Sequence, residues 1–144
     1  MRLSAKAQYA CVAMVDLASS HADPNPVHLK HIADRHGISQ RFLVQILLQL
    51  KGAGLVDSTR GATGGYLLAK APSLITLADI VHAIDQPPPP APSALAGLYS
   101  SPVVQVVSSF LQEAQDREQI RLAEITLDEL VKQAHQRSEI SYQI

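Results

Sequence analysis

The sequence predicts a mainly α-helical fold with one small β hairpin and a long helix towards the C-terminus. Three observations predict this. Apolar residues recur at helical spacing along most of the chain, a glycine-rich stretch joins two short apolar runs near residues 58–70, and a proline run at 87–90 divides the chain. With 144 residues, 47% of them hydrophobic, the chain can form one domain with an aliphatic core and an appendage.

A first helix is expected over residues 4–20, with Ser4 as its cap and with Ala7, Ala10 and Met14 at helical spacing. Basic residues precede this stretch, but Asp16 interrupts it, so the pattern indicates an amphipathic helix and not a signal peptide. No apolar run approaches the roughly 20 residues of a membrane span. We therefore expect a cytoplasmic protein that does not contact a membrane.

Two further helices follow in close succession and predict a helix-turn-helix. In "VHLKHIADRHG", Leu29, Ile32 and Ala33 form an apolar stripe that ends at Gly37. In "ISQRFLVQILLQLKGAG", Ser39 is expected to cap the helix through its hydroxyl. One face of this helix holds its large apolar residues, namely Phe42, Leu43, Ile46, Leu47 and Leu50. The join "HGIS" has the short spacing of a helix-turn-helix.

Residues 55–60 and 66–70 predict two short strands around the tip "GATGG". The tip contains no acid, and Arg60 stands at its base. Because the hairpin follows a helix-turn-helix, we interpret it as a wing whose slim tip lies against a phosphate backbone while Arg60 enters a narrow minor groove. The alternative is an ordinary hairpin with a solvated arginine.

The remainder of the chain predicts a connector and a long helix. Thr76 caps a helix in "TLADIVHAIDQ", and the proline run that follows is expected to be a stiff connector. Ser101 and Pro102 begin a helix whose apolar set is wider than one stripe, so this helix is expected to bury two faces. A capping box of Thr126 and Glu129 begins the last helix.

These elements predict three parts. A winged helix-turn-helix occupies residues 1–86, a Pro-rich connector 87–100, and a dimerisation helix with a C-terminal helix 101–144. Residues 1–86 carry a net charge of +2 and residues 87–144 a net charge of −3, which fits a chain with two tasks. We expect the long helix to form a homodimer interface through Val103, Val107, Phe110 and Leu111.

Four segments resemble, in order and spacing, the Rrf-two family of bacterial winged-helix transcription regulators, which includes the iron–sulfur cluster regulator and the nitric-oxide-sensitive repressor. They are "MRLSAKAQYACVAMVDLA", "IADRHGISQRFLVQILLQLKGAGLV", "STRGATGGYLLAK" and "ITLADIVHAIDQ". The resemblance is close over residues 1–86, and the pattern RGxxGGYxL is its specific part. It implies a homodimer joined by the long helix. We therefore predict a sequence-specific regulator that acts as a repressor on a palindromic operator in double-stranded DNA.

One departure from the family concerns its cofactor. Cluster-binding members hold an iron–sulfur cluster with three cysteines in the segment before the dimer helix, but "PPPPAPSALAGLYSSPV" has no cysteine, histidine or acid here. Cys11 is the only cysteine of the chain. We therefore predict no iron–sulfur cluster and no other cofactor. The signal is left open between a small-molecule effector, a partner protein and none.

Candidate DNA contacts fall into three sets. Base edges are assigned to the exposed start of the second helix of the helix-turn-helix: Gln40, Arg41, Val44 and Gln45. Backbone contacts are assigned to Ser39 and to Arg2, Lys6, Tyr9 and Lys51. Wing contacts are assigned to Arg60, Gly61, Thr63, Gly64, Gly65 and Tyr66. The alternative for each polar residue is a solvated surface, and Leu48 is either partly buried or in contact with another element.

Three other functions compete with DNA binding. His28 and His31 lie one turn apart with Asp34 and His36 nearby, which would suit a metal-responsive regulator, although scattered surface histidines are commoner than ligands, and we predict no metal site. No nucleophile elbow, phosphate-cradling loop or paired carboxylate motif indicates an enzyme. A winged helix used only for protein contacts is the stronger alternative, and Arg41 with Arg60 favours DNA over it.

Overall fold

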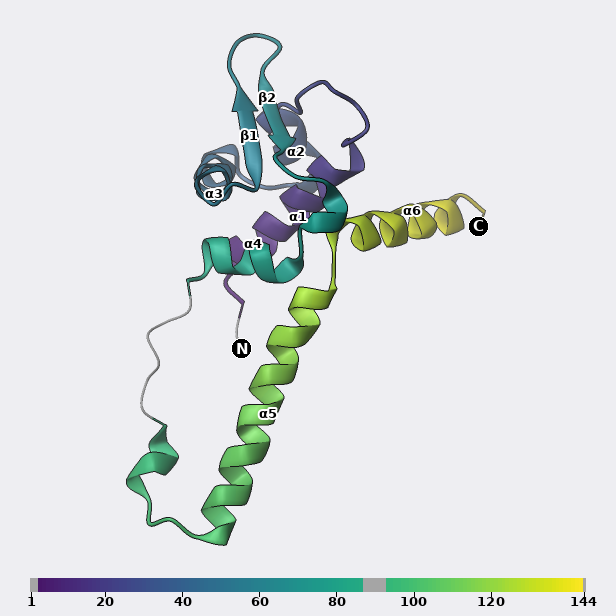
Figure 1. The fold of residues 1–144 in the computed structure, drawn as a ribbon. Coiled ribbons are helices and arrows are strands. Elements are labelled where there is room, and N and C mark those ends of the chain that lie inside the picture. The colour runs from purple at the N-terminus through teal and green to yellow at the C-terminus, as the bar shows by residue number, and fades with distance from the viewer. Residues whose placement is uncertain (1–2, 87–92, 144) are drawn as a thin grey trace.

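The computed structural model describes residues 3–86 and 93–143, and it confirms a mainly helical fold with a two-stranded wing. A winged-helix body carries a long helix that runs away from it (Figure 1). The elements in chain order are α1 (Ala5–Ser19), α2 (Leu29–His36), α3 (Gln40–Gly52), β1 (Val56–Thr59), β2 (Gly65–Leu68), the 3-10 turn η1 (Pro72–Leu74), α4 (Leu77–Ile84), the 3-10 turn η2 (Ala94–Gly97), α5 (Pro102–Glu124) and α6 (Leu127–Gln143). The proline run of the connector and the candidate contact Arg2 lie outside the described residues.

Helix α1 lies at the centre of the body and packs against α3, α4 and α6. Ala7, Ala10 and Ala13 are fully buried on one face of α1. Their small side chains let the neighbouring helices approach closely. The hydroxyl of Ser4 accepts a hydrogen bond from the Ala7 amide at 3.0 Å, which confirms the predicted cap.

The core is aliphatic, as predicted, and α3 contributes its whole apolar face to it. The largest fully buried side chains come from every major helix of the body: Met14, Ile32, Leu43, Ile46, Leu47, Leu50, Ile75, Ile80 and Leu127. Phe42 is half-buried beside this core, and its ring packs edge-on against Tyr9 of α1, with the ring centroids 5.6 Å apart. Helix α3 is therefore fixed rigidly against α1, and its opposite face is exposed.

The wing is an antiparallel hairpin in which Val56 pairs with Leu68 and Thr59 with Gly65. The loop before α2 extends this pairing. The Val27 amide donates to the Tyr66 carbonyl at 2.9 Å, and the Tyr66 amide donates to the Val27 carbonyl at 2.8 Å. The hairpin is thus fastened to the helix-turn-helix on one side.

The ends of α1 and α4 are joined directly. A capping box of Thr76 and Asp79 begins α4, as the sequence predicted in part. At the other end of α4, the carboxylate of Asp85 accepts a hydrogen bond from the Ser4 hydroxyl at 2.6 Å and another from the Ser4 amide at 3.1 Å. This contact fixes the chain where it leaves the body towards the connector.

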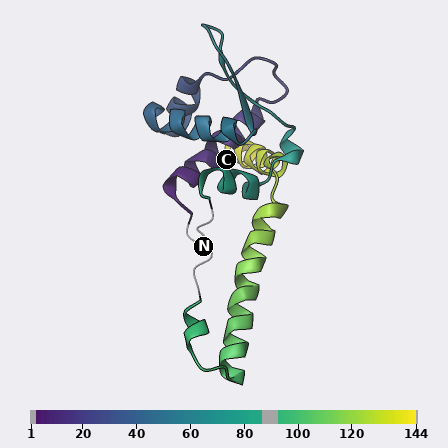
Figure 2. The ribbon, with the colours of Figure 1, turned by 60° about the vertical axis from the view of Figure 1, so that its left-hand side comes forward.

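Helix α5 leaves the body and α6 returns to it. No residue of α5 is buried, and both ribbon views show α5 projecting away from the body (Figures 1 and 2). The side chain of Leu127, at the start of α6, is fully buried. Two backbone hydrogen bonds of 2.9 Å support this return, from Leu77 to Ile125 and from Leu127 to Ile75. None of the helices in the described part of the chain has both the length and the apolar character needed to cross a membrane.

Candidate nucleic-acid interface

A tight turn between α2 and α3 sets the direction of α3. Gly37 ends α2 with a left-handed φ of 67°, a conformation that favours glycine. The amides of Gly37 and Ile38 both donate to the Ala33 carbonyl. Ile38 is buried and anchors the turn in the core. Because the turn is closed by these bonds, α3 begins only three residues after Gly37, as a helix-turn-helix requires.

A buried ion-pair cluster, which sequence reasoning did not find, ties this turn to α1. The Asp16 side chain is only 4% exposed. Its Oδ2 lies 2.5 Å from Nε2 of His36, and its Oδ1 lies 3.1 Å from Nη2 of Arg35. Oδ1 makes no hydrogen bond of good geometry within the described residues, so Arg35 compensates its charge without satisfying it fully. We call Asp16, Arg35 and His36 the α1–α2 clasp.

The outer face of α3 gathers the residues predicted to read bases. Exposed side chains there are Gln40, Arg41, Val44, Gln45, Leu48 and Gln49. The helix contains no acidic residue. Ser39 occupies the predicted N-cap position, but its hydroxyl makes no capping hydrogen bond, contrary to our expectation. The amides of the first turn of α3 are therefore not capped by this side chain.

The residues predicted to contact DNA from the wing fall into an exposed group and a more buried group. Arg60, Gly61 and Thr63 are exposed at the tip. Gly64 is buried, and a Cβ at this position would lie 2.2 Å from the Thr59 carbonyl oxygen. A Cβ on Gly65 would lie 2.4 Å from the Val27 carbonyl oxygen. Gly64 therefore allows the hairpin to turn back on itself, and Gly65 allows the close approach of the loop before α2, whereas the first group forms the outer surface.

Three more of the candidate residues lie at the edges of this surface. Tyr66 is half-buried and packs against the core. Lys51, near the end of α3, donates from Nζ to the Ser58 hydroxyl at 2.7 Å and so links α3 to β1. Lys6 is half-buried on α1, one turn before the exposed Tyr9. Through Lys51 and Ser58, and through Tyr9 and Phe42, both the wing and α1 adjoin α3.

The charge of this region differs from that of the whole chain. Residues 39–68, which contain α3 and the wing, carry Arg41, Lys51 and Arg60 and a single acid, Asp57. The whole chain has a net charge of −1. Positive charge is therefore concentrated where the exposed face of α3 and the wing tip lie, which suits a polyanionic partner.

Helix α5 presents a second, apolar surface. The four residues predicted for a dimer interface, Val103, Val107, Phe110 and Leu111, are all exposed in the single chain, and Phe110 is 68% exposed. Val106 is exposed beside them. Contiguous apolar surface of this kind marks an interaction site more often than a free surface.

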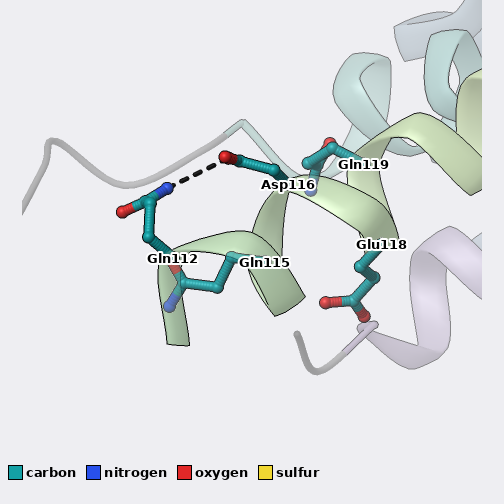
Figure 3. A pocket seen from close by; sticks show the side chains of 5 residues that line it. All are labelled: Gln112, Gln115, Asp116, Glu118 and Gln119. Carbon is teal, nitrogen blue, oxygen red and sulfur yellow. Dashed lines mark hydrogen bonds between the residues drawn. The ribbon is translucent and has the colours of Figure 1, made fainter. Parts of the chain in front are cut away.

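Hollows also occur along α5. One of about 300 Å³ is lined by Gln112, Gln115, Asp116, Glu118 and Gln119 (Figure 3), where the Gln112 side-chain amide donates to Asp116 at 3.0 Å. Another, of about 360 Å³, lies between η2 and α5, where serine hydroxyls and small apolar side chains line it. The lining residues of both are far in sequence from α3 and the wing.

Metal and thiol chemistry find little support among the described residues. His28 and His31 pack edge-to-face, with ring centroids 5.4 Å apart. The described residues contain no group of three or more His, Cys, Asp or Glu side chains that could hold a metal ion. Burial, together with the nearby charge of Asp85, raises the pKa of the Cys11 thiol to about 11. In the absence of a metal, Cys11 therefore keeps its proton at neutral pH and is a poor nucleophile.

Comparison with known proteins supports the same architecture. The chain is 45% identical over 86 residues to the HTH-type transcriptional regulator IscR of Photorhabdus laumondii. The matched segment covers 60% of this chain but only 52% of that protein. It is 40% identical over 87 residues to CymR of Bacillus subtilis, with 60% of this chain and 62% of that protein covered. The chain therefore spans less than two thirds of the length of these curated relatives.

Solved structures match over nearly the whole chain. T. potens IscR gives a TM-score of 0.75 at 34% identity, covering 93% of this chain and 88% of that one. CymR, described as the global cysteine regulator of B. subtilis, gives 0.75 at 31% identity, covering 92% and 97%. The family profile described as "Rrf2: Iron-dependent Transcriptional regulator" matches residues 3–133. The chain is therefore a member of the Rrf2 family.

Proposed function

We propose that this chain is a sequence-specific DNA-binding transcriptional regulator that acts as a homodimer without an iron–sulfur cluster. The observation that carries the proposal is the exposed, acid-free face of α3 beside a slim wing whose tip presents Arg60. A major groove admits an α-helix, and the second helix of a helix-turn-helix enters it with its N-terminal residues against the base edges.

Each part of the candidate surface has a role in this arrangement. Arg41 suits guanine, Gln40 and Gln45 suit adenine, and Val44 suits a thymine methyl group. The first-turn amides of α3, with the Ser39 hydroxyl, suit a phosphate. Arg60 would enter the minor groove, where a narrow groove strengthens the negative potential.

The exposed apolar face of α5 supports the homodimer. In a single chain, Val103, Phe110 and Leu111 remain in water. A second copy of the chain would cover them, because in a two-fold dimer the same face of both copies meets. A two-fold dimer places two α3 helices on one side of a duplex, which predicts a palindromic operator with half-sites about one helical turn apart, or a multiple of this.

The residues of this chain do not fit an iron–sulfur cluster, although the family profile is described as iron-dependent. Clusters are held chiefly by several thiolates. This chain has one cysteine, which lies on α1 and far in sequence from the segment that leads into α5. Residues 93–104, which lead into α5, contain no cysteine, histidine or acid.

Regulation would then act through DNA occupancy. Repression by occlusion of a promoter requires only tight binding, which α3, the wing and the dimer helix would supply. A signal, if the protein has one, would act through a small-molecule effector or a partner protein. The hollow between η2 and α5 lies at the end of the dimer helix that is far from the body, and a ligand there would act on the dimer helix.

The salt dependence of DNA binding tests the proposal. Each phosphate contact releases counterions, so the logarithm of the binding constant should fall steeply and linearly with the logarithm of salt concentration. Arg60→Ala should weaken binding at least fivefold and flatten the slope by about 0.9 for each lost phosphate contact. Arg137→Ala, an exposed arginine on α6, is the matched control and should bind as the wild type does. Binding that is weak and insensitive to salt in all three proteins would favour a protein-interaction module.

The absence of a cluster has its own test. Protein purified without oxygen from iron-rich medium should contain substoichiometric iron and acid-labile sulfide and should lack a visible charge-transfer band. Stoichiometric iron and sulfide that are lost in Cys11→Ala would contradict this part of the proposal.

A further inference from the structure

Leu48 has no place in the core and no assigned role. It is 59% exposed, whereas the other leucines of α3, Leu43, Leu47 and Leu50, are fully buried. Val44, one turn earlier, is 40% exposed. The two residues form an apolar ridge on the outer face of α3. Helix α3 itself lies beside the wing (Figure 1).

The ridge lies in the middle of the candidate DNA-facing surface. At 100° per residue, Leu48 and Arg41 point in directions only about 20° apart, both opposite Leu43. Seven residues of helix separate them along the axis by roughly 10 Å. For a helix that lies in the major groove, this distance spans at most about three base pairs at 3.4 Å each. The same side of α3 therefore presents the guanidinium of Arg41 and, two turns later, the side chain of Leu48.

The chemistry of the surroundings indicates what this ridge contacts. The helix has no acid, and Gln45 and Gln49 flank the leucine, so the surface suits a groove lined by hydrogen-bonding base edges. The major groove offers one apolar group, the C5-methyl of thymine. A leucine left in water gains nothing from its apolar surface, whereas contact with a methyl group removes apolar area of both from water.

We propose that Leu48, together with Val44, selects thymine by packing on its C5-methyl group, at a position within about three base pairs of the base that Arg41 contacts. The inference rests on the proposed function, since it requires α3 to lie in a major groove. It adds a rule for the operator: each half-site contains thymine at the position under Leu48. Removal of one such methyl group should weaken binding about fourfold, and removal from both half-sites about 16-fold.

Uracil substitution tests this rule directly. Deoxyuridine pairs as thymidine does but lacks the C5-methyl group. The wild-type full chain first selects its best duplex from a random pool, and each thymine of the half-site is then replaced by uracil in turn. We expect one or two positions at which uracil weakens wild-type binding about fourfold per half-site. At the position under Leu48, the Leu48→Ala variant should bind thymine and uracil duplexes equally.

Leu74→Ala is the matched control, since Leu74 is 67% exposed but lies on η1. This variant should discriminate thymine from uracil as the wild type does. Leu48→Ala removes little from the core, and alanine is a better helix former than leucine, so the variant should fold. Discrimination retained in Leu48→Ala, or no effect of uracil at any position in the wild type, would overturn the inference alone. A wild-type protein that selects no duplex would overturn the proposed function and this inference with it.

Discussion

Replacing both Arg35 and His36 by alanine should destabilise the protein far more than the loss of two partly exposed side chains would suggest. These residues are the partners of Asp16 in the α1–α2 clasp, and the Asp16 side chain is only 4% exposed. The double variant would leave a buried carboxylate without a cation. Removal of the partner of a buried charge costs about 3–5 kcal/mol, because desolvation is no longer compensated.

The single variants should cost less, for reasons visible in the geometry. Arg35 is half exposed, so Arg35→Ala leaves His36 in place at 2.5 Å and should cost about 1 kcal/mol. Asp16→Asn removes the buried charge itself and leaves the half-exposed Arg35 within reach of water, so its cost should be about 1–2 kcal/mol. The order of the three variants, and not only their size, follows from which charge is left buried.

Urea denaturation followed by circular dichroism measures these differences. Protein concentration must be held fixed, since formation of the proposed dimer would make the apparent stability depend on it. With a slope of about 1–3 kcal/mol per molar urea, the double variant should shift the midpoint by at least ~1 M. Lys132→Ala, which breaks an exposed pair with Asp128, is the control and should change stability by less than about 0.5 kcal/mol. A double variant as stable as this control would refute the reasoning.

Three further predictions concern the dimer, the wing and the thiol. Phe110→Asp should give a folded monomer by light scattering, because Phe110 is exposed in the single chain and a charge in a packed interface costs several kcal/mol; an unchanged dimer would contradict the interface. Gly64→Ala should leave helicity unchanged but weaken DNA binding, since its Cβ would meet the Thr59 carbonyl, whereas Gly97→Ala, with open space around it, should bind normally. The rate of Cys11 alkylation in the folded protein should rise about tenfold per pH unit up to about pH 11, because only the thiolate reacts and the pKa of this thiol is raised to about 11. In urea the rate should instead level off near pH 9, the ordinary pKa of a thiol. The same plateau in the folded protein would contradict the burial of Cys11.

Local signals explain why the elements could be predicted from the sequence. Ser4, Thr76 and Ser101 each accept a hydrogen bond from an amide three residues later, which is a contact that spacing alone reveals. Gly37 has the positive φ that its place after α2 suggested. The apolar face of α3 is buried, as its periodicity indicated. These features depend on a few neighbouring residues, so a sequence pattern records them.

Long-range contacts explain what the sequence did not reveal. Asp16 interrupts an apolar helix face, but nothing in the pattern identifies Arg35 and His36 as its partners. Ser4 and Asp85 are 81 residues apart, and no local signal pairs them. The glycine-rich tip predicts a DNA contact at Gly64, and no sequence pattern indicates that this residue is buried where the hairpin turns back. Such pairings arise only when the elements pack together.

Selection of duplexes from a random pool by the purified, metal-free full chain tests the central claim most directly. We predict enrichment of one palindromic motif, with half-sites separated so that two α3 helices reach major grooves on the same side of the duplex. Loss of this enrichment in Arg41→Ala, with folding unchanged, would tie the sequence preference to α3. A wild-type dimer that enriches no motif over random DNA at moderate salt would contradict the account.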